Sequence, residues 1–174
     1  MGGASAQLAV REIVKLLQEM FAIEVGGYIM KLILKSLPIL YMAFIWYLSS
    51  YPSDAVIHLG LPFEAMLKES LHLVEFAGVY ILWVLFFLVS GKFDRKRNIL
   101  AVVIAIAYGF IDETHQYFVP SRSAAVIDLV KDTVGVMAAW YVVNGAYFNG
   151  RFPIIGEGIK WVEERCADRE NGVD

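Results

Sequence analysis

The sequence ILAVVIAIAYGFI (residues 99–111) continues without a break into DETHQYFVPSR (residues 112–122). The first stretch is uncharged and predicts the apolar part of a membrane helix at about residues 98–118. The second stretch gathers ionisable side chains at the end of that helix. Ionisable groups at the mouth of a membrane helix cost free energy to place there, so they usually carry function. We therefore expect the functional site to include this stretch.

The composition of the whole chain also indicates a membrane protein. Hydrophobic residues make up 58% of the chain and charged residues 19%, and the mean hydropathy is +0.56. A soluble domain is about 45–50% apolar and about 25% charged. Because the apolar excess lies in four blocks, the sequence predicts an all-α polytopic membrane protein. We expect four transmembrane helices, at about residues 32–51, 71–90, 98–118 and 124–148.

The two ends of the chain have a different pattern. Apolar residues recur at helical spacing between charges in residues 5–24 and again in residues 154–170, which predicts amphipathic N- and C-terminal helices. The chain thus divides into an N-terminal cytoplasmic or interfacial segment (1–31), a four-helix membrane domain (32–148) and a C-terminal cytoplasmic amphipathic tail (149–174).

The positions of lysine and arginine predict the orientation. The loop between the second and third expected helices holds Lys92, Arg95, Lys96 and Arg97, and both terminal segments also carry lysine and arginine residues. By the positive-inside rule, we expect a multi-pass plasma-membrane protein with both termini in the cytoplasm and residues 112–122 outside.

The sequence lacks both a nucleic-acid-binding tract and a pair of cysteines. It has no basic tract of the kind that binds nucleic acid. Cys166 is the only cysteine, which excludes an intramolecular disulfide within this chain.

This topology brings the ends of three helices together on the outer side. His72 and Glu75 are three residues apart and share a helical face, and Lys68 precedes His72 by one turn. Asp128 and Asp132 share a face of the fourth helix in the same way. The expected site therefore comprises His72, Glu75, Asp112, Glu113, His115, Gln116, Asp128 and Asp132, with Lys68, Arg122 and Lys131 as cations.

The same residues resemble the signature of the VanZ-like family of bacterial membrane proteins. The resemblance runs from about residue 32 to residue 147 and has two departures: Ser121 stands where glycine is common, and Asp132 where asparagine is common. It implies a cell-envelope protein linked to low-level resistance to the glycopeptide teicoplanin. The positions of the motif in this chain are Lys68, His72, Glu75, Phe76, Asp112, Glu113, His115, Gln116, Phe118, Pro120, Arg122, Asp128, Asp132 and Gly135.

One hypothesis is an enzyme that acts on a lipid-linked or cell-wall phosphate. Arg122, with Lys68 or Lys131, would hold an anionic oxygen, while Asp132 completes the substrate-binding set. His72 or His115 would act as a general base or bind a divalent metal ion. The remaining carboxylates, Glu75, Asp112, Glu113 and Asp128, would hold that ion or orient the base.

The alternative is a non-catalytic binding or structural module. Asp112, Glu113 and Arg122 would then form an ion-pair network that locks the helix ends, and Lys131 would pair or snorkel. The ligand would be a cell-wall lipid intermediate, a glycopeptide or a partner membrane protein. A transport path through a monomer is disfavoured, because no charged residue lies deep in the first or third expected helix.

Overall fold

The computed structural model describes residues 11–12, 27–51, 64–120 and 126–167, with side chains of α2 and α4 described from Ile29 and Leu73 onward. This part of the chain is all-helical, as predicted. The elements are α2 (Gly27–Ser49), α4 (Glu64–Val89), α5 (Arg95–Tyr117), α6 (Val126–Asn149) and α7 (Pro153–Ala167).

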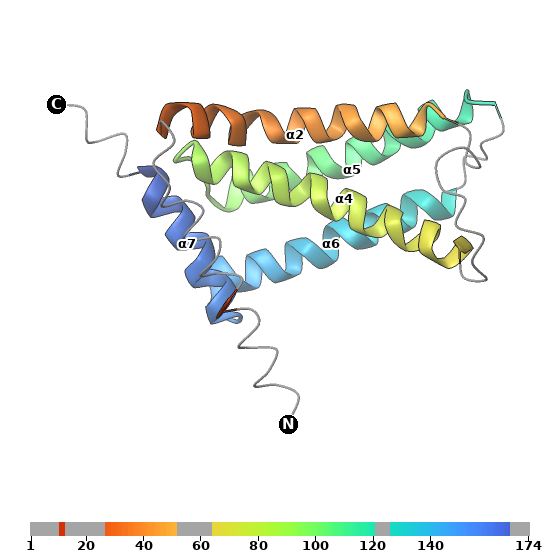
Figure 1. The fold of residues 1–174 in the computed structure, drawn as a ribbon. Helices are drawn as coiled ribbons and strands as arrows, with labels where there is room; N and C mark the ends of the chain where they lie inside the picture. Colours follow the sequence, from red (N-terminus) through yellow and green to blue (C-terminus); the bar gives the residue numbers. More distant parts are fainter. Residues whose placement is uncertain (1–10, 13–26, 52–63, 121–125, 168–174) are drawn as a thin grey trace.

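The four long helices lie roughly alongside one another and alternate in direction, while α7 crosses one end of the bundle (Figure 1). We call that end the basic end, because α4 finishes and α5 starts there around Lys92, Arg95, Lys96 and Arg97. We call the other end the polar end. There α2 and α5 finish, and α4 and α6 begin.

The membrane character of the helices is confirmed in part. Two helices in the described ranges, Ile29–Ser49 and Arg95–Tyr117, are long and apolar enough to cross a bilayer. The apolar segment Leu73–Val89 of α4 is shorter, and α6 carries charge in its first turns. The four helices are therefore present, but four membrane spans are not confirmed.

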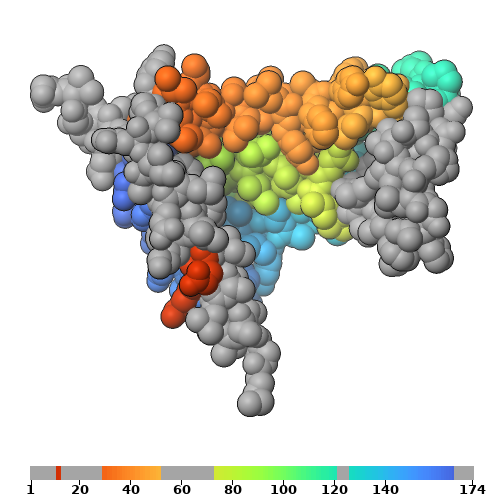
Figure 2. Space-filling view, viewed as in Figure 1, coloured from red at the N-terminus to blue at the C-terminus, as the bar shows by residue number. Residues whose placement is uncertain are grey.

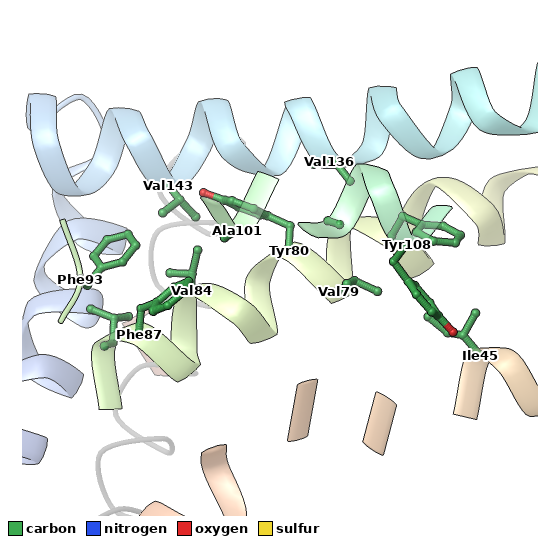
Figure 3. Packing of buried hydrophobic residues seen from close by; sticks show 13 residues of the cluster. Ile45, Val79, Tyr80, Val84, Phe87, Phe93, Ala101, Tyr108, Val136 and Val143 are labelled. Atoms are coloured by element: carbon green, nitrogen blue, oxygen red, sulfur yellow. The ribbon is translucent and has the colours of Figure 1, made fainter. Parts of the chain in front are cut away.

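The helix α4 occupies the centre of the bundle and packs against α2, α5, α6 and α7; its yellow-green surface lies between α2 and α6 in Figure 2. Its residues Phe76, Val79 and Tyr80 are fully buried and form the middle of the apolar core. This core runs from Phe93 near the basic end to Ile45 near the polar end (Figure 3). Because the core occupies the bundle interior, the polar side chains gather at the ends.

A single glycine sets the distance between α4 and α6. A methyl group on Gly135 would overlap the backbone carbonyl oxygen of Leu73, so no larger residue fits at this crossing. Small residues let membrane helices approach closely in this way. The two helices therefore touch near the polar end and separate toward the basic end, where α7 lies (Figure 1).

The observed helix boundaries agree with the expected ones except in two places. The second helix begins at Glu64 instead of near Leu71, because residues 64–70 are mostly good helix formers. The first helix begins at Gly27 and continues through Pro38 as one helix. Of the expected amphipathic helix at residues 5–24, only Arg11 and Glu12 lie in the described residues, and they are helical.

Candidate functional site

Five carboxylates from three helices gather at the polar end. Glu75 is on α4, Asp112 and Glu113 are on α5, and Asp128 and Asp132 are on α6. The other four are all close enough to Asp132 for their charges to repel its carboxylate. Their charges are not isolated, since Glu75, Asp112, Glu113 and Asp132 all have interacting partners. The structure thus brings together the acidic residues that the sequence pattern grouped.

Asp112 is held in a buried network that joins α2 to α5. The hydroxyl of Ser49 donates a hydrogen bond of 2.9 Å to Oδ2 of Asp112. The side-chain amide of Gln116 donates one of 2.7 Å to the same oxygen. A buried carboxylate needs such donors, because desolvation of its charge is costly. Asp112 is only 2% exposed, so this network fixes both helix ends.

Asp132 lies one turn deeper in α6 than Asp128 and is 3% exposed. Its carboxylate faces Gly109 of α5, where an added methyl group would lie 3.5 Å from Oδ2 of Asp132. The same methyl group would lie 3.4 Å from the ring of Phe76. Gly109 therefore leaves the space that this carboxylate occupies between α5 and α6.

Glu75 and Asp128 have different surroundings. Glu75 is half-buried and lies near the phenol groups of Tyr41 and Tyr108, on which its charge acts. Asp128 instead accepts a hydrogen bond of 3.0 Å from the ammonium group of Lys131 within α6. This ion pair is the pairing role that the sequence left open for Lys131, and it favours a structural role for Asp128.

His115 is packed against an aromatic ring. Its imidazole stacks on the indole of Trp46, with ring centroids 3.9 Å apart and planes 19° apart. Its Nδ1 atom is buried and has no hydrogen-bond partner within the part of the chain that the structure describes. Among the described residues, no group of three or more His, Cys, Asp or Glu side chains is arranged to hold a metal ion. The stack of His115 on Trp46 thus joins the end of α5 to the end of α2.

Three of the expected site residues cannot be placed in this geometry. The side chains of Lys68 and His72 on α4 lie outside the described residues, and so does the whole of Arg122. Their expected roles as cations, base or metal ligand stay predictions.

The sequence pattern missed several residues that shape the site. Ser49, Trp46 and Gly109 each contact an expected site residue, as described above. Nothing in the sequence indicates that Ser49 contacts Asp112, because serine is common at helix ends and the two residues are 63 positions apart. Gly109 was visible as a small residue within a membrane helix, but nothing in the sequence tied it to Asp132.

Comparison with known proteins identifies the family. Neither the curated proteins nor the solved structures gave a significant match. The VanZ/LLP1 family matches residues 36–147, which hold most of α2, all of α4 and α5, and α6 almost to its end. The match includes every candidate site residue and leaves out α7. The chain therefore belongs to the VanZ/LLP1 family.

Proposed function

We propose that this protein is a four-span plasma-membrane protein of the cell envelope whose polar end faces outward and binds a lipid-linked cell-wall intermediate. The observation that carries the proposal is the convergence of five carboxylates from α4, α5 and α6 at one end of an apolar bundle. Groups that are so costly to bury near a bilayer are retained for function. In this proposal residues 32–148 form the membrane domain, and both termini are cytoplasmic.

The surface of the bundle supports four spans. Large apolar side chains are exposed on α4 and α6 as well as on the two longer apolar helices; examples are Val74 and Ile81 on α4 and Ile127 and Val134 on α6. Such residues suit contact with lipid hydrocarbon. Exposed aromatic residues lie near the polar end, where α2 and α5 finish, as in an interfacial belt: Trp46, Tyr47, Tyr51, Tyr117 and Phe118.

The charge pattern supports the orientation and the kind of ligand. The basic end carries the lysine and arginine residues that favour the cytoplasmic side. At the polar end, carboxylates accept hydrogen bonds from hydroxyl and ammonium groups. A sugar or amino-acid headgroup supplies such donors, and its phosphate is left to Arg122 and Lys68. The carboxylates would then also serve as acid or base in a reaction on the bound headgroup.

A second candidate is a non-catalytic structural or binding module. The network of Ser49, Asp112 and Gln116 favours it, because the carboxylate there is satisfied by its own chain. The ion pair of Asp128 and Lys131 favours it too. On this reading the polar end locks the helices, and resistance arises from ligand binding alone.

Complementation of a deletion strain tests the proposal. We expect Glu75→Gln and Asp132→Leu to abolish teicoplanin resistance while the protein still accumulates in the membrane. Asp132→Asn should retain resistance, since asparagine is common at this position in the family. Glu157→Gln and Glu164→Gln on the exposed face of α7 are matched controls and should behave as wild type. Full resistance in both site variants would refute the proposal, whereas loss of folded protein in both would favour the structural module.

Cysteine labelling tests the topology. In a Cys166→Ser background, we expect Pro120→Cys to react with a membrane-impermeant maleimide in intact cells. Lys92→Cys should react only after the cells are opened. Both positions are exposed in the structure, so a difference between them reports the side of the membrane. The opposite labelling pattern would place the polar end in the cytoplasm.

A further inference from the structure

Two arginines at the basic end are held against aromatic rings of α6. The guanidinium of Arg95 lies 4.8 Å from the centre of the Phe148 ring. The guanidinium of Arg151 lies 5.3 Å from the centre of the Tyr141 ring. Tyr141 and Phe148 are seven residues apart, so they lie on one face of α6, about 10 Å apart along its axis. Two guanidinium groups therefore pack on residues of the same helix face.

The backbone after α6 folds back so that Arg151 reaches this face. Gly150 has a φ of 63°, and the backbone N–H of Arg151 then donates a hydrogen bond of 2.8 Å to the carbonyl of Gly145. A methyl group on Gly145 would lie 3.1 Å from the ring of Phe152 and 3.6 Å from Cβ of Arg151, so the glycine leaves room for this close return. Arg151 is therefore held alongside the last two turns of α6 instead of beyond the end of the helix.

Neither Arg95 nor Arg151 forms an ion pair with a carboxylate within the described part of the chain, and both residues are exposed. Arg97 at the same end differs, because its guanidinium forms an ion pair of 3.1 Å with Asp94. A ring face attracts the charge of a guanidinium and leaves most of its five N–H donors uncommitted. Arg95 and Arg151 are thus fixed in place with donors available for an anionic oxygen.

The surroundings of the two arginines favour a lipid headgroup as the source of that oxygen. In the proposed four-span topology α6 crosses the bilayer and finishes at the basic end (Figure 1). An exposed tyrosine near the end of a membrane helix, such as Tyr141, is typical of the headgroup layer. A phosphate group accepts two parallel hydrogen bonds from one guanidinium, which a ring-stacked arginine supplies with little loss of freedom.

The charge at this end also favours a lipid with a net negative charge. Lys92 and Lys96 are exposed beside the arginines and add to the positive potential. They attract an anionic phospholipid, whereas they repel the cationic group of a zwitterionic one. The five carboxylates of the polar end would repel the same anionic lipid. The two ends of the bundle therefore differ in the lipid charge that they favour.

We propose that the basic end binds anionic phospholipid, with Arg95 and Arg151 as the residues that hold the lipid phosphate groups. Phe148 and Tyr141 are positioning residues, because they touch the guanidinium groups and not the lipid phosphate. The inference goes beyond the proposed function. It rests on the membrane topology proposed there and is independent of the ligand at the polar end.

Native mass spectrometry of the full chain, released from detergent micelles with added lipid, tests the proposal. The probes are phosphatidylglycerol and phosphatidylcholine with identical acyl chains, so that only the headgroup differs. We expect the protein to bind phosphatidylglycerol about tenfold more tightly. Glycerol 1-phosphate, which has an anionic phosphate and no acyl chain, should not be retained at the same concentration.

Matched variants make the test specific. Arg95→Gln and Arg151→Gln should each weaken binding of phosphatidylglycerol about fivefold, because each removes a guanidinium that holds a phosphate. Arg97→Gln removes the same charge from the same end, but its guanidinium is already paired with Asp94, so the affinity should change less than twofold. Tyr141→Phe keeps the ring and should bind as wild type, whereas Tyr141→Leu should weaken binding about threefold.

Four results would overturn the inference. Equal binding of the two phospholipids would show that the headgroup charge is not recognised. An equal loss in Arg97→Gln and the other two arginine variants would assign the attraction to the net charge of this end. Unchanged affinity in Arg95→Gln, Arg151→Gln and Tyr141→Leu would place the lipid elsewhere. Retention of glycerol 1-phosphate as strong as that of phosphatidylglycerol would assign the arginines to a soluble anion.

Failure of the proposed function is distinguishable from failure of this inference. The function at the polar end is read from the teicoplanin resistance of cells that carry Glu75→Gln. Lipid binding at the basic end is read from the purified protein, whichever side of the membrane that end faces. Full resistance of Glu75→Gln together with selective binding of phosphatidylglycerol would refute the former and support the latter.

Discussion

The two ends of the bundle use buried polar side chains for different purposes. Toward the basic end the buried pair is neutral: the hydroxyl of Tyr80 in the middle of α4 donates a hydrogen bond of 2.7 Å to Asn98 in the first turn of α5. The cations at this end are exposed, as with Arg95, whose guanidinium lies 4.8 Å from the centre of the Phe148 ring. Between α4 and α5, charge is thus kept at the surface, and a neutral pair joins the two helices inside.

At the polar end, charge is placed inside. Asp112 and Asp132 are both nearly fully buried, and Glu75 and Glu113 are partly buried beside them. A neutral pair such as that of Tyr80 and Asn98 would suffice to hold the helices together. The contrast teaches that helix packing accounts for the basic end, whereas the acids of the polar end exceed what packing requires.

The largest expected effect concerns close packing near the polar end. Gly135→Ala would drive a methyl group into the carbonyl of Leu73, so we expect a loss of about 3 kcal/mol of unfolding free energy. Titration with SDS in mixed micelles measures this loss. Gly158→Ala is the control and should be neutral or slightly stabilising, by roughly 0.5–1 kcal/mol. Equal effects in the two variants would show that the crossing does not depend on Gly135.

The second effect concerns the buried carboxylate network. Asp112→Ala removes the acceptor that Ser49 and Gln116 share, which leaves the Ser49 hydroxyl without its buried acceptor and Gln116 with only its 3.4 Å bond to the Ser49 oxygen. We expect a loss of about 2 kcal/mol, since a buried donor without a partner costs about 1–3 kcal/mol. Ser49→Ala should cost about half as much. A wild-type unfolding free energy for Asp112→Ala would mean that the network contributes nothing to stability.

The third effect is the counterpart at the basic end. Tyr80→Phe removes the hydrogen bond to Asn98 and should cost about 1 kcal/mol, the usual scale for a polar pair between membrane helices. Because the Tyr80 hydroxyl lies at Asn98, in the first turn of α5 and 14 residues before Asp112, the proposed teicoplanin resistance should be unchanged. A Tyr80→Phe variant that folds but loses the proposed resistance would contradict the claim that buried polar residues toward the basic end serve helix packing alone.

The smallest effect concerns the partly exposed ion pair. Lys131→Met should lower the unfolding free energy by about 0.5 kcal/mol, because the side chains of Asp128 and Lys131 are 22% and 24% exposed and exposed pairs contribute little. A loss of the proposed teicoplanin resistance at this small cost in stability would instead favour contact of Lys131 with the proposed ligand.

Much of the fold could be predicted from the sequence, because the helix positions follow local apolar runs and breakers such as Gly91 and Gly150, both at positive φ. The grouping of the acids followed from topology and helical spacing. The contacts of His115 could not be predicted from topology or helical spacing. Its stack on Trp46 joins residues far apart in sequence, and only packing of α2 against α5 brings them together.

The same limit applies to the C-terminal helix. Its amphipathic pattern predicted a surface helix, and α7 spans Pro153–Ala167 as expected. Its docking against the bundle, through a hydrogen bond from Tyr147 to Glu163, could not be predicted from periodicity. Pairs of this kind depend on how two helices rotate relative to each other, which the spacing of residues within one helix does not determine.

The contact of Leu73 with Gly135 has a mechanical consequence. Two packed rods whose closest approach lies near one end pivot at that place, and the displacement produced by a change in their angle grows with distance from the pivot. Asp132 is one turn from that point, whereas Leu88 and Val143 are far from it. A change in the angle between α4 and α6 would therefore widen the bundle near α7 and leave the carboxylates almost still.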